Sequence, residues 1–190
     1  MRDRFLHDVL ANRNNHAILE RWDALELPEG WLVAGCLFQT VWNLQSGLPP
    51  EAQIKDYDIF YFDGSDLSPE AEQRVQARAD CLLADLDIAV ELKNQARVHL
   101  WYEDVFGHPY PQLQSATEGI DRFLIPATCV GIHRDGASYE IYAPHGIELI
   151  YSGVLSPNPL TDHAGLFREK ARSYMARWPW LRVEHAAEAA

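Results

Sequence analysis

The chain has 190 residues, of which 47% are hydrophobic and 23% are charged, and its formal net charge is −12. That length is typical of one domain with a substantial core, so we expect a single domain over residues 1–190. The negative charge disfavours an extended nucleic-acid surface, because such a surface needs basic residues. Three cysteines without a Cys-x-x-Cys pair argue against a disulfide framework or a zinc knuckle.

No apolar run approaches the roughly 18 residues that span a bilayer. The N-terminal segment MRDRFLHDVL also lacks the apolar stretch of a secretory signal. We therefore expect a cytoplasmic protein without a membrane partner.

The first quarter of the chain predicts helices, then a strand, a glycine and another helix. Apolar residues recur at helical spacing within residues 2–26, on both sides of an Asn-rich break at 12–15, which predicts two short helices. Residues 31–34 predict an apolar strand that ends at Gly35. Apolar residues then recur at helical spacing over 36–46, which predicts a helix. This order leaves free backbone N–H groups at a helix N-terminus, a place suited to phosphate. Tight packing at the junction is the alternative reason for the glycine.

Residues 55–63, KDYDIFYFD, carry two carboxylates at the start of an apolar and aromatic run that ends in a Gly-containing turn. Such a run predicts a strand, on which Asp56 and Asp58 point to one face, roughly 6.6 Å apart along the strand. Two carboxylates this close repel by a few kcal/mol at an effective dielectric of about 20, unless a cation, a proton or solvent offsets them. Taken alone, the pair fits a solvated strand start as well as a metal site.

Two alternating segments follow, residues 86–92 and 96–102, and only three residues separate them. We predict a hairpin from this pattern, with Glu91 across from Arg97 and with His99 on the same face. Arg97 and His99 would then orient a phosphate or an acceptor, although an arginine that simply pairs with Glu91 explains the pattern equally well.

The remaining elements complete a mixed α+β chain. Residues 68–70 have the cap residue, the proline and the acid of a helix start. A short helix is expected near 117–124, a second hairpin over 129–142 and a C-terminal helix over about 161–177. The prediction is a small mixed β-sheet flanked by helices, with the N-terminal and C-terminal helices packed on it.

Three carboxylates in this element order, Asp56, Asp58 and Glu91, can converge on one edge of a sheet. Their hard oxygen atoms suit Mg²⁺, which proteins hold with carboxylates and substrate phosphates. Two such ions would clamp the attacking and leaving oxygens of a phosphoryl displacement.

At this point the sequence resembles the nucleotidyltransferase superfamily. Its pattern is Gly-Gly or Gly-Ser at a helix start, then Asp-x-Asp on the next strand and a third acid on a later strand. A narrower resemblance is to a bacterial family of nucleotidyltransferase-like proteins of unassigned substrate. The matching segments are AGCLFQTVWN (34–43), KDYDIFYFD (55–63), VELKNQARVHLWY (90–102), IDRFLIPATCVGI (120–132), YAPHGIELIY (142–151) and SPNP (156–159).

The resemblance implies a nucleotidyltransferase-like fold and a role for each motif. Asp56 and Asp58 would bind catalytic Mg²⁺ or Mn²⁺, and Glu91 would complete the metal site and act as a base towards an acceptor hydroxyl. The backbone near Gly35 and Cys36 would hold the nucleoside triphosphate. Asp87, earlier on the strand predicted to carry Glu91, is the alternative third carboxylate.

Three functions remain open at this level. The first is transfer of a nucleoside monophosphate from an NTP to an unknown acceptor hydroxyl. The second is a nucleotide-binding or interaction module without turnover, favoured by Cys36 at the second motif position and by a long spacer before Asp56. The third is a structural domain with scattered acidic groups, which requires Asp58 and Glu91 to lie on different faces. The acceptor, the preferred base and the oligomeric state are not indicated.

Overall fold

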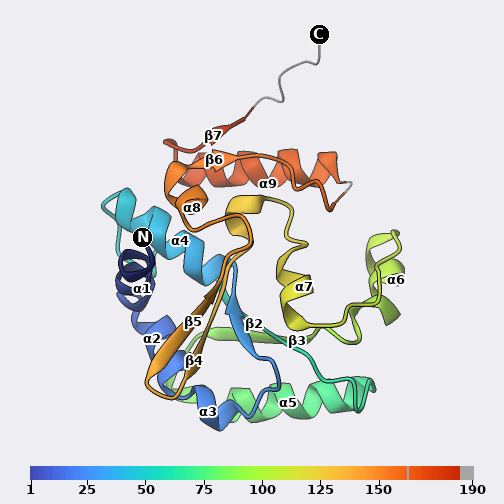
Figure 1. Ribbon diagram of the computed structural model, residues 1–190. Helices are drawn as coiled ribbons and strands as arrows, with labels where there is room; N and C mark the ends of the chain where they lie inside the picture. The colour runs from blue at the N-terminus through green and yellow to red at the C-terminus, as the bar shows by residue number, and fades with distance from the viewer. Residues whose placement is uncertain (162, 185–190) are drawn as a thin grey trace.

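The computed structural model describes residues 1–161 and 163–184, and within them five strands form one mixed sheet (Figure 1). The strand order is β3-β2-β1-β4-β5, with β2 and β3 parallel and the other neighbours antiparallel. A small parallel pair, β6 and β7, stands apart from this sheet. The strands are β1 (Trp31–Val33), β2 (Asp56–Tyr61), β3 (Ala89–Asn94), β4 (Gly131–Asp135), β5 (Ser138–Tyr142), β6 (Val154–Leu155) and β7 (Arg182–Val183).

Helices flank the sheet, which confirms the predicted α+β class. In Figure 1, α5 runs along the bottom, α6 and α7 lie to the right, and α9 crosses the top. The α-helices are α1 (Arg2–Leu10), α2 (Arg13–Glu20), α3 (Trp22–Leu25), α4 (Gly35–Gln45), α5 (Pro69–Leu82), α6 (Tyr102–Phe106), α7 (Ala116–Ile120), α8 (Glu148–Ser152) and α9 (Ala164–Arg177). Short 3₁₀ turns are η1 (Ala84–Leu86), η2 (Val98–Leu100) and η3 (Pro126–Thr128).

Several predicted bounds shift in the structure. The N-terminal region forms three helices instead of two, and α9 begins at Ala164 instead of near 161. Residue 162 lies outside the described part of the chain. Among the helices that the structure describes, none is both long and apolar enough to cross a bilayer.

The central strand β2 has the predicted alternation. Tyr57, Ile59 and Tyr61 are buried on one face, whereas Asp56 is exposed and Asp58 is half-buried on the other. A period of two is expected for a strand with one face on the core. The two aspartates therefore share the face of β2 that is not filled by the core, as the sequence predicts.

The Asn-rich break is a buried polar junction and not a solvated loop. Asn12 caps α2 by accepting from two backbone N–H groups, and its amide donates to Thr40 in α4 at 2.9 Å. The amide of Asn15 donates to the carbonyl of Cys36 at 3.0 Å. Because buried polar groups need partners, this network fixes the first turns of α4 against α2.

The first predicted hairpin is wrong. Strand β3 pairs in parallel with β2, and the chain then leaves the sheet through η2 and α6. Arg97 is buried at this turn, where it forms an ion pair with Glu72 of α5 and donates to the carbonyl of Leu67. A partner on α5 therefore replaces the predicted cross-strand contact between Arg97 and Glu91.

The second predicted hairpin is confirmed. Strands β4 and β5 are antiparallel, with Gly131 opposite Tyr142 and Asp135 opposite Ser138. Gly136 occupies the turn with φ +57°, a conformation that glycine adopts without steric cost.

Candidate functional site

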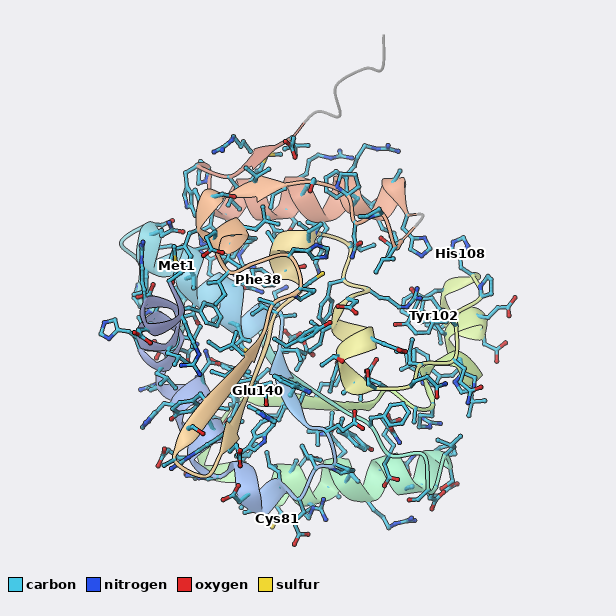
Figure 2. The ribbon with its side chains drawn as sticks, viewed as in Figure 1. Met1, Phe38, Cys81, Tyr102, His108 and Glu140 are labelled. Atoms are coloured by element: carbon cyan, nitrogen blue, oxygen red, sulfur yellow. The ribbon has the colours of Figure 1, made fainter. Side chains whose placement is uncertain are left out.

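A cavity of about 210 Å³ lies where the N-terminus of α4, strand β2, the 123–128 segment and helix α9 meet. The two aspartates of β2 form part of its wall. The lining residues are Ala34, Gly35, Phe38, Gln39, Asp56, Asp58, Phe123, Leu124, Ile125, Thr128, Lys170 and Tyr174. Figure 2 places Phe38 in the interior of the molecule on α4. The cavity thus joins the predicted phosphate-binding turn to the predicted carboxylate pair.

The backbone at the start of α4 is held in an uncommon conformation. Ala34 has φ +48° and ψ −111°, and its N–H donates to the carbonyl of Val130 in the neighbouring segment at 2.9 Å. A non-glycine residue at such angles costs about 1–3 kcal/mol, and this kind of strain concentrates at functional sites. The methyl group of Ala34 cannot cap the helix, so the N–H groups of Gly35 and Cys36 are left for another acceptor.

The sheet register brings Glu91 beside Asp58. In the parallel β2–β3 pair Asp58 lies opposite Glu91, and Asp56 lies opposite Ala89. Asp87 precedes the strand in a left-handed turn with φ +52°. Of the two candidate third carboxylates, the structure therefore places Glu91 alongside the pair, and it does not scatter Asp58 and Glu91 over different faces.

Negative charge is concentrated around Asp58. Burial, and then the nearby carboxylates of Asp56 and Glu91, raise the pKa of Asp58 from its ordinary 3.8 to about 7, while Lys170 and Lys93 lower it. The two lysines thus offset only part of the repulsion. A carboxylate that is costly to ionise in these surroundings is one whose charged form a bound cation would stabilise.

The three carboxylates do not close into one cluster. Lys93 forms an ion pair with Glu91, 2.9 Å between Nζ and Oε1. Within residues 1–161 and 163–184, no three His, Cys, Asp or Glu side chains are grouped closely enough to hold a metal ion. The donor chemistry of Asp56 and Asp58 nevertheless fits a hard divalent cation whose remaining ligands come from phosphate and water.

Of the other predicted site residues, Gly35 lines the cavity, whereas Arg97 and His99 are not among its described lining residues. The thiol of Cys36 is fully buried, and burial followed by the charge of Asp58 raises its pKa well above the usual value. This side chain is therefore a neutral core group, and only the backbone of Cys36 can face a ligand. His99 belongs to η2, so it does not share a strand face with Glu91 as predicted.

A family model for nucleotidyltransferases matches residues 20–183 of this sequence. The chain belongs to the nucleotidyltransferase family. A solved NMR structure, described as a CCA-adding enzyme head domain, is similar to this chain with a TM-score of 0.75 and 22% identity. The match covers 97% of this chain and 96% of that one, and at this identity it shows the fold alone. No curated protein matches the sequence.

The match to the nucleotidyltransferase family includes two cavity residues that sequence reasoning missed, Lys170 and Tyr174. Both belong to α9, one helical turn apart, and the Lys170 ammonium lies 5.7 Å from the centre of the Tyr174 ring. The signal that could have singled out Lys170 was its i, i+4 spacing to Tyr174, but nothing in the sequence connects α9 with β2.

Proposed function

We propose that the chain is a metal-dependent nucleotidyltransferase that moves a nucleoside monophosphate from an NTP to an acceptor hydroxyl and releases pyrophosphate. The observation that carries the proposal is the cavity in which Asp56 and Asp58 meet the uncapped first turn of α4. Family membership and fold support nucleotidyl transfer in general. The metal, the nucleotide and the acceptor are the proposed parts.

The triphosphate would bind at the start of α4. The N–H groups of Gly35 and Cys36 lie at the positive end of the helix dipole. Lys170, which also lines the cavity, adds a formal positive charge. Their positive charge and partial charge would offset the repulsion between the phosphate oxygens and the nearby carboxylates.

Asp56 and Asp58 would hold Mg²⁺ or Mn²⁺ together with oxygens of the bound phosphates. The ion supplies electrostatic stabilisation of the charge that develops on the phosphate oxygens during transfer. The elevated pKa of Asp58 means that this carboxyl group has to lose its proton before it can act as a ligand.

The transfer joins the acceptor oxygen to the α-phosphorus of the NTP. The bond from that phosphorus to the oxygen bridging the α- and β-phosphates breaks, and pyrophosphate leaves with the bond electrons. The acceptor hydroxyl gives its proton to a carboxylate oxygen of Glu91, which lies beside Asp58 in the register. Lys93 forms an ion pair with the same carboxylate and would hold it in place for the transfer.

Calorimetric titration of ATP into the protein, with Mg²⁺ or with EDTA, tests the site. We expect Mg²⁺-dependent binding that is lost in the Asp56→Asn, Asp58→Asn double variant. A matched control is the Asp23→Asn, Asp135→Asn double variant, which makes the same charge change at two exposed positions. Equal affinity of the site variant and the control would contradict the assignment.

A binding module without turnover is the second candidate. Two observations favour it: the buried thiol of Cys36 at the second motif position, and the absence of a closed three-carboxylate group from the described residues. Such a module would bind Mg²⁺ and ATP with the same dependence on Asp56 and Asp58. It would release no pyrophosphate with any acceptor.

A further inference from the structure

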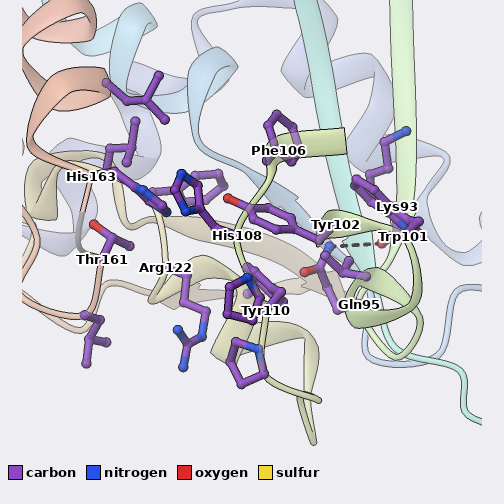
Figure 3. A pocket seen from close by; sticks show the side chains of 18 of the residues that line it. Lys93, Gln95, Trp101, Tyr102, Phe106, His108, Tyr110, Arg122, Thr161 and His163 are labelled. Atoms are coloured by element: carbon purple, nitrogen blue, oxygen red, sulfur yellow. Dashed lines mark hydrogen bonds between the residues drawn. The ribbon is translucent and has the colours of Figure 1, made fainter. Parts of the chain in front are cut away.

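A second, larger cavity of about 660 Å³ adjoins the carboxylate site. Its lining is rich in aromatic side chains and comes from β2 and from the 93–111, 119–124 and 160–166 segments; Figure 3 labels ten of the lining residues. The aromatic side chains are Phe60, Trp101, Tyr102, Phe106, Tyr110 and Phe123. We call this cavity the aromatic pocket. Its volume is that of a small-molecule site, and aromatic walls are typical of such sites.

The aromatic pocket and the carboxylate cavity share two lining residues, Phe123 and Leu124, and both are lined by β2. Phe60 lies on the same face of β2 as Asp58, two residues further along, and Lys93 lies opposite Phe60 just as Glu91 lies opposite Asp58. One step of roughly 6.6 Å along the strands therefore separates the carboxylates from this wall. Phe123 lines both cavities, and its ring stacks on Phe60 with centroids 5.4 Å apart.

The described lining of the aromatic pocket has basic side chains and no acidic ones, although Lys93 is paired with Glu91 outside the lining. Among the described residues its lining includes Lys93, Arg122 and two histidines, and no aspartate or glutamate. The chain as a whole has a net charge of −12. Arg122 lies 5.5 Å from the centre of the Tyr110 ring, and Figure 3 shows it beside Tyr110, on the opposite side from Lys93. A cavity with this lining favours an anion.

The rim of the aromatic pocket exposes large apolar side chains. Phe106 of α6 is 50% exposed, and Leu160 and Leu166 on the opposite rim are 53% and 46% exposed. Tyr102 and His108 lie near α6, at the right-hand edge of the molecule in Figure 2. A cluster of exposed apolar side chains around a cavity marks a binding site better than scattered ones do.

We propose that the aromatic pocket is the acceptor site, and that it takes a planar aromatic molecule that carries an anionic group. The ring stacks among Tyr102, Tyr110 and Phe60, and the anionic group pairs with Arg122. The hydroxyl that receives the nucleotide then points past Phe60 towards Glu91. The assignment of the ligand as an acceptor rests on the proposed function. The chemical class of the ligand is inferred from the lining of the aromatic pocket alone.

The probe for this chemistry is 1-naphthyl phosphate, with 1-naphthol and inorganic phosphate as its two halves. We expect saturable binding of 1-naphthyl phosphate by calorimetry, with an affinity at least about tenfold above that of either half, because stacking and ion pairing both contribute. Binding of either half as tight as that of 1-naphthyl phosphate would overturn the proposal.

Leu166→Glu places a carboxylate on the rim at a partly exposed position of α9 that tolerates a polar side chain. We expect it to weaken 1-naphthyl phosphate binding about tenfold, and Leu166→Gln to weaken it less, because only the former repels the anion. Ala176→Glu makes the same charge change on the same helix, at an exposed position about 15 Å along the axis. Equal effects of the two glutamates would overturn the proposal.

Competition with ATP separates the acceptor from the donor nucleotide. If the aromatic pocket holds the acceptor, 1-naphthyl phosphate leaves Mg²⁺-dependent ATP binding unchanged. If the pocket instead holds the base of the NTP, the two ligands compete, and the acceptor assignment fails. The Asp56→Asn, Asp58→Asn variant distinguishes the two proposals. We expect this variant to lose ATP binding and to keep its full affinity for 1-naphthyl phosphate. If the unaltered protein binds 1-naphthyl phosphate but not ATP, the proposed function fails and the ligand class of the aromatic pocket is supported.

Discussion

At the scale of single residues, the Asp58 carboxyl group determines what the site can do. It is half-buried, with Asp56 on its own strand and Glu91 opposite it on the next. Burial and these two like charges raise its pKa to about 7. The same residue is therefore a source of instability in the empty protein and a ligand in the proposed complex.

Replacement of Asp58 by asparagine should stabilise the empty protein at neutral and alkaline pH. Because the folded pKa lies above the unfolded value, the stability that the proton confers is fully present below about pH 4 and is lost as the pH rises through about 7. The advantage of Asp58→Asn should therefore grow between these limits, to at most about 4 kcal/mol. Urea unfolding at a series of pH values measures it, with the exposed Asp23→Asn as control. An advantage that is independent of pH would contradict this explanation.

Lys170 should contribute to nucleotide binding without contributing much to the fold. It lines the carboxylate cavity and lowers the pKa of Asp58. We expect Lys170→Met to weaken Mg²⁺-dependent ATP binding about tenfold, because one partner of a charge-assisted contact is lost. Arg172→Met, at an exposed position of the same helix, is the control. If both variants bind ATP alike, Lys170 has no role in phosphate binding.

At the scale of secondary-structure elements, the turn after β3 depends on α5. Glu72 of α5 accepts from the backbone N–H of Asn94 at 2.8 Å and forms an ion pair with Arg97, and the two side chains are 16% and 10% exposed. The pair ends the strand and directs the chain into the segment that walls the aromatic pocket. A buried pair of this kind is costly to break on one side only.

The free energies of unfolding lost on replacing Glu72 and Arg97 should not be additive. We expect Arg97→Met to destabilise the fold by about 3 kcal/mol, because it leaves the Glu72 carboxylate buried and unpaired. The Glu72→Gln, Arg97→Met double variant should lose less than the sum of the two single changes. Arg74→Met, which breaks the exposed pair with Asp66, should cost under about 1 kcal/mol. Additive losses in a denaturant-based double-mutant cycle would contradict this view of the pair.

The sequence predicted the helices and strands better than it predicted which of them contact one another. Periodicity located α4, α5, β2 and the β4–β5 hairpin because each shows its burial pattern locally. The prediction of the first hairpin was wrong because alternation over residues 96–102 does not indicate which element the segment contacts. Arg97 pairs with Glu72, which lies 25 residues earlier in the chain. For the same reason Asp56 and Asp58 were found from their strand, whereas Lys170, more than 100 residues away, was not.

At the scale of the whole molecule, we expect the excess of acidic residues to limit the class of partner. With 28 acidic and 16 basic residues, the chain has little positive surface for a nucleic-acid backbone. The described lining of the aromatic pocket is the exception, and its volume of about 660 Å³ suits a small molecule or a single terminal group.

Binding of long nucleic acids should accordingly be weak. We expect a random-sequence RNA of about 30 nucleotides to show no measurable binding in filter retention at about 150 mM salt, and little change at about 50 mM. A steep dependence of binding on salt would indicate several phosphate contacts and would contradict this limit.

Transfer of label from an α-³²P-labelled NTP measures nucleotidyl transfer by this protein directly. The protein is incubated with each NTP, Mg²⁺ and a fractionated extract that supplies acceptors, and both labelled products and released pyrophosphate are measured. We expect Mg²⁺-dependent label in a product together with an equal amount of pyrophosphate, both lost in the Asp56→Asn, Asp58→Asn variant and kept in the Asp23→Asn, Asp135→Asn control. Product formation that is unchanged in the Asp56→Asn, Asp58→Asn variant would contradict the proposed function, as would the absence of labelled product and pyrophosphate with every NTP and fraction.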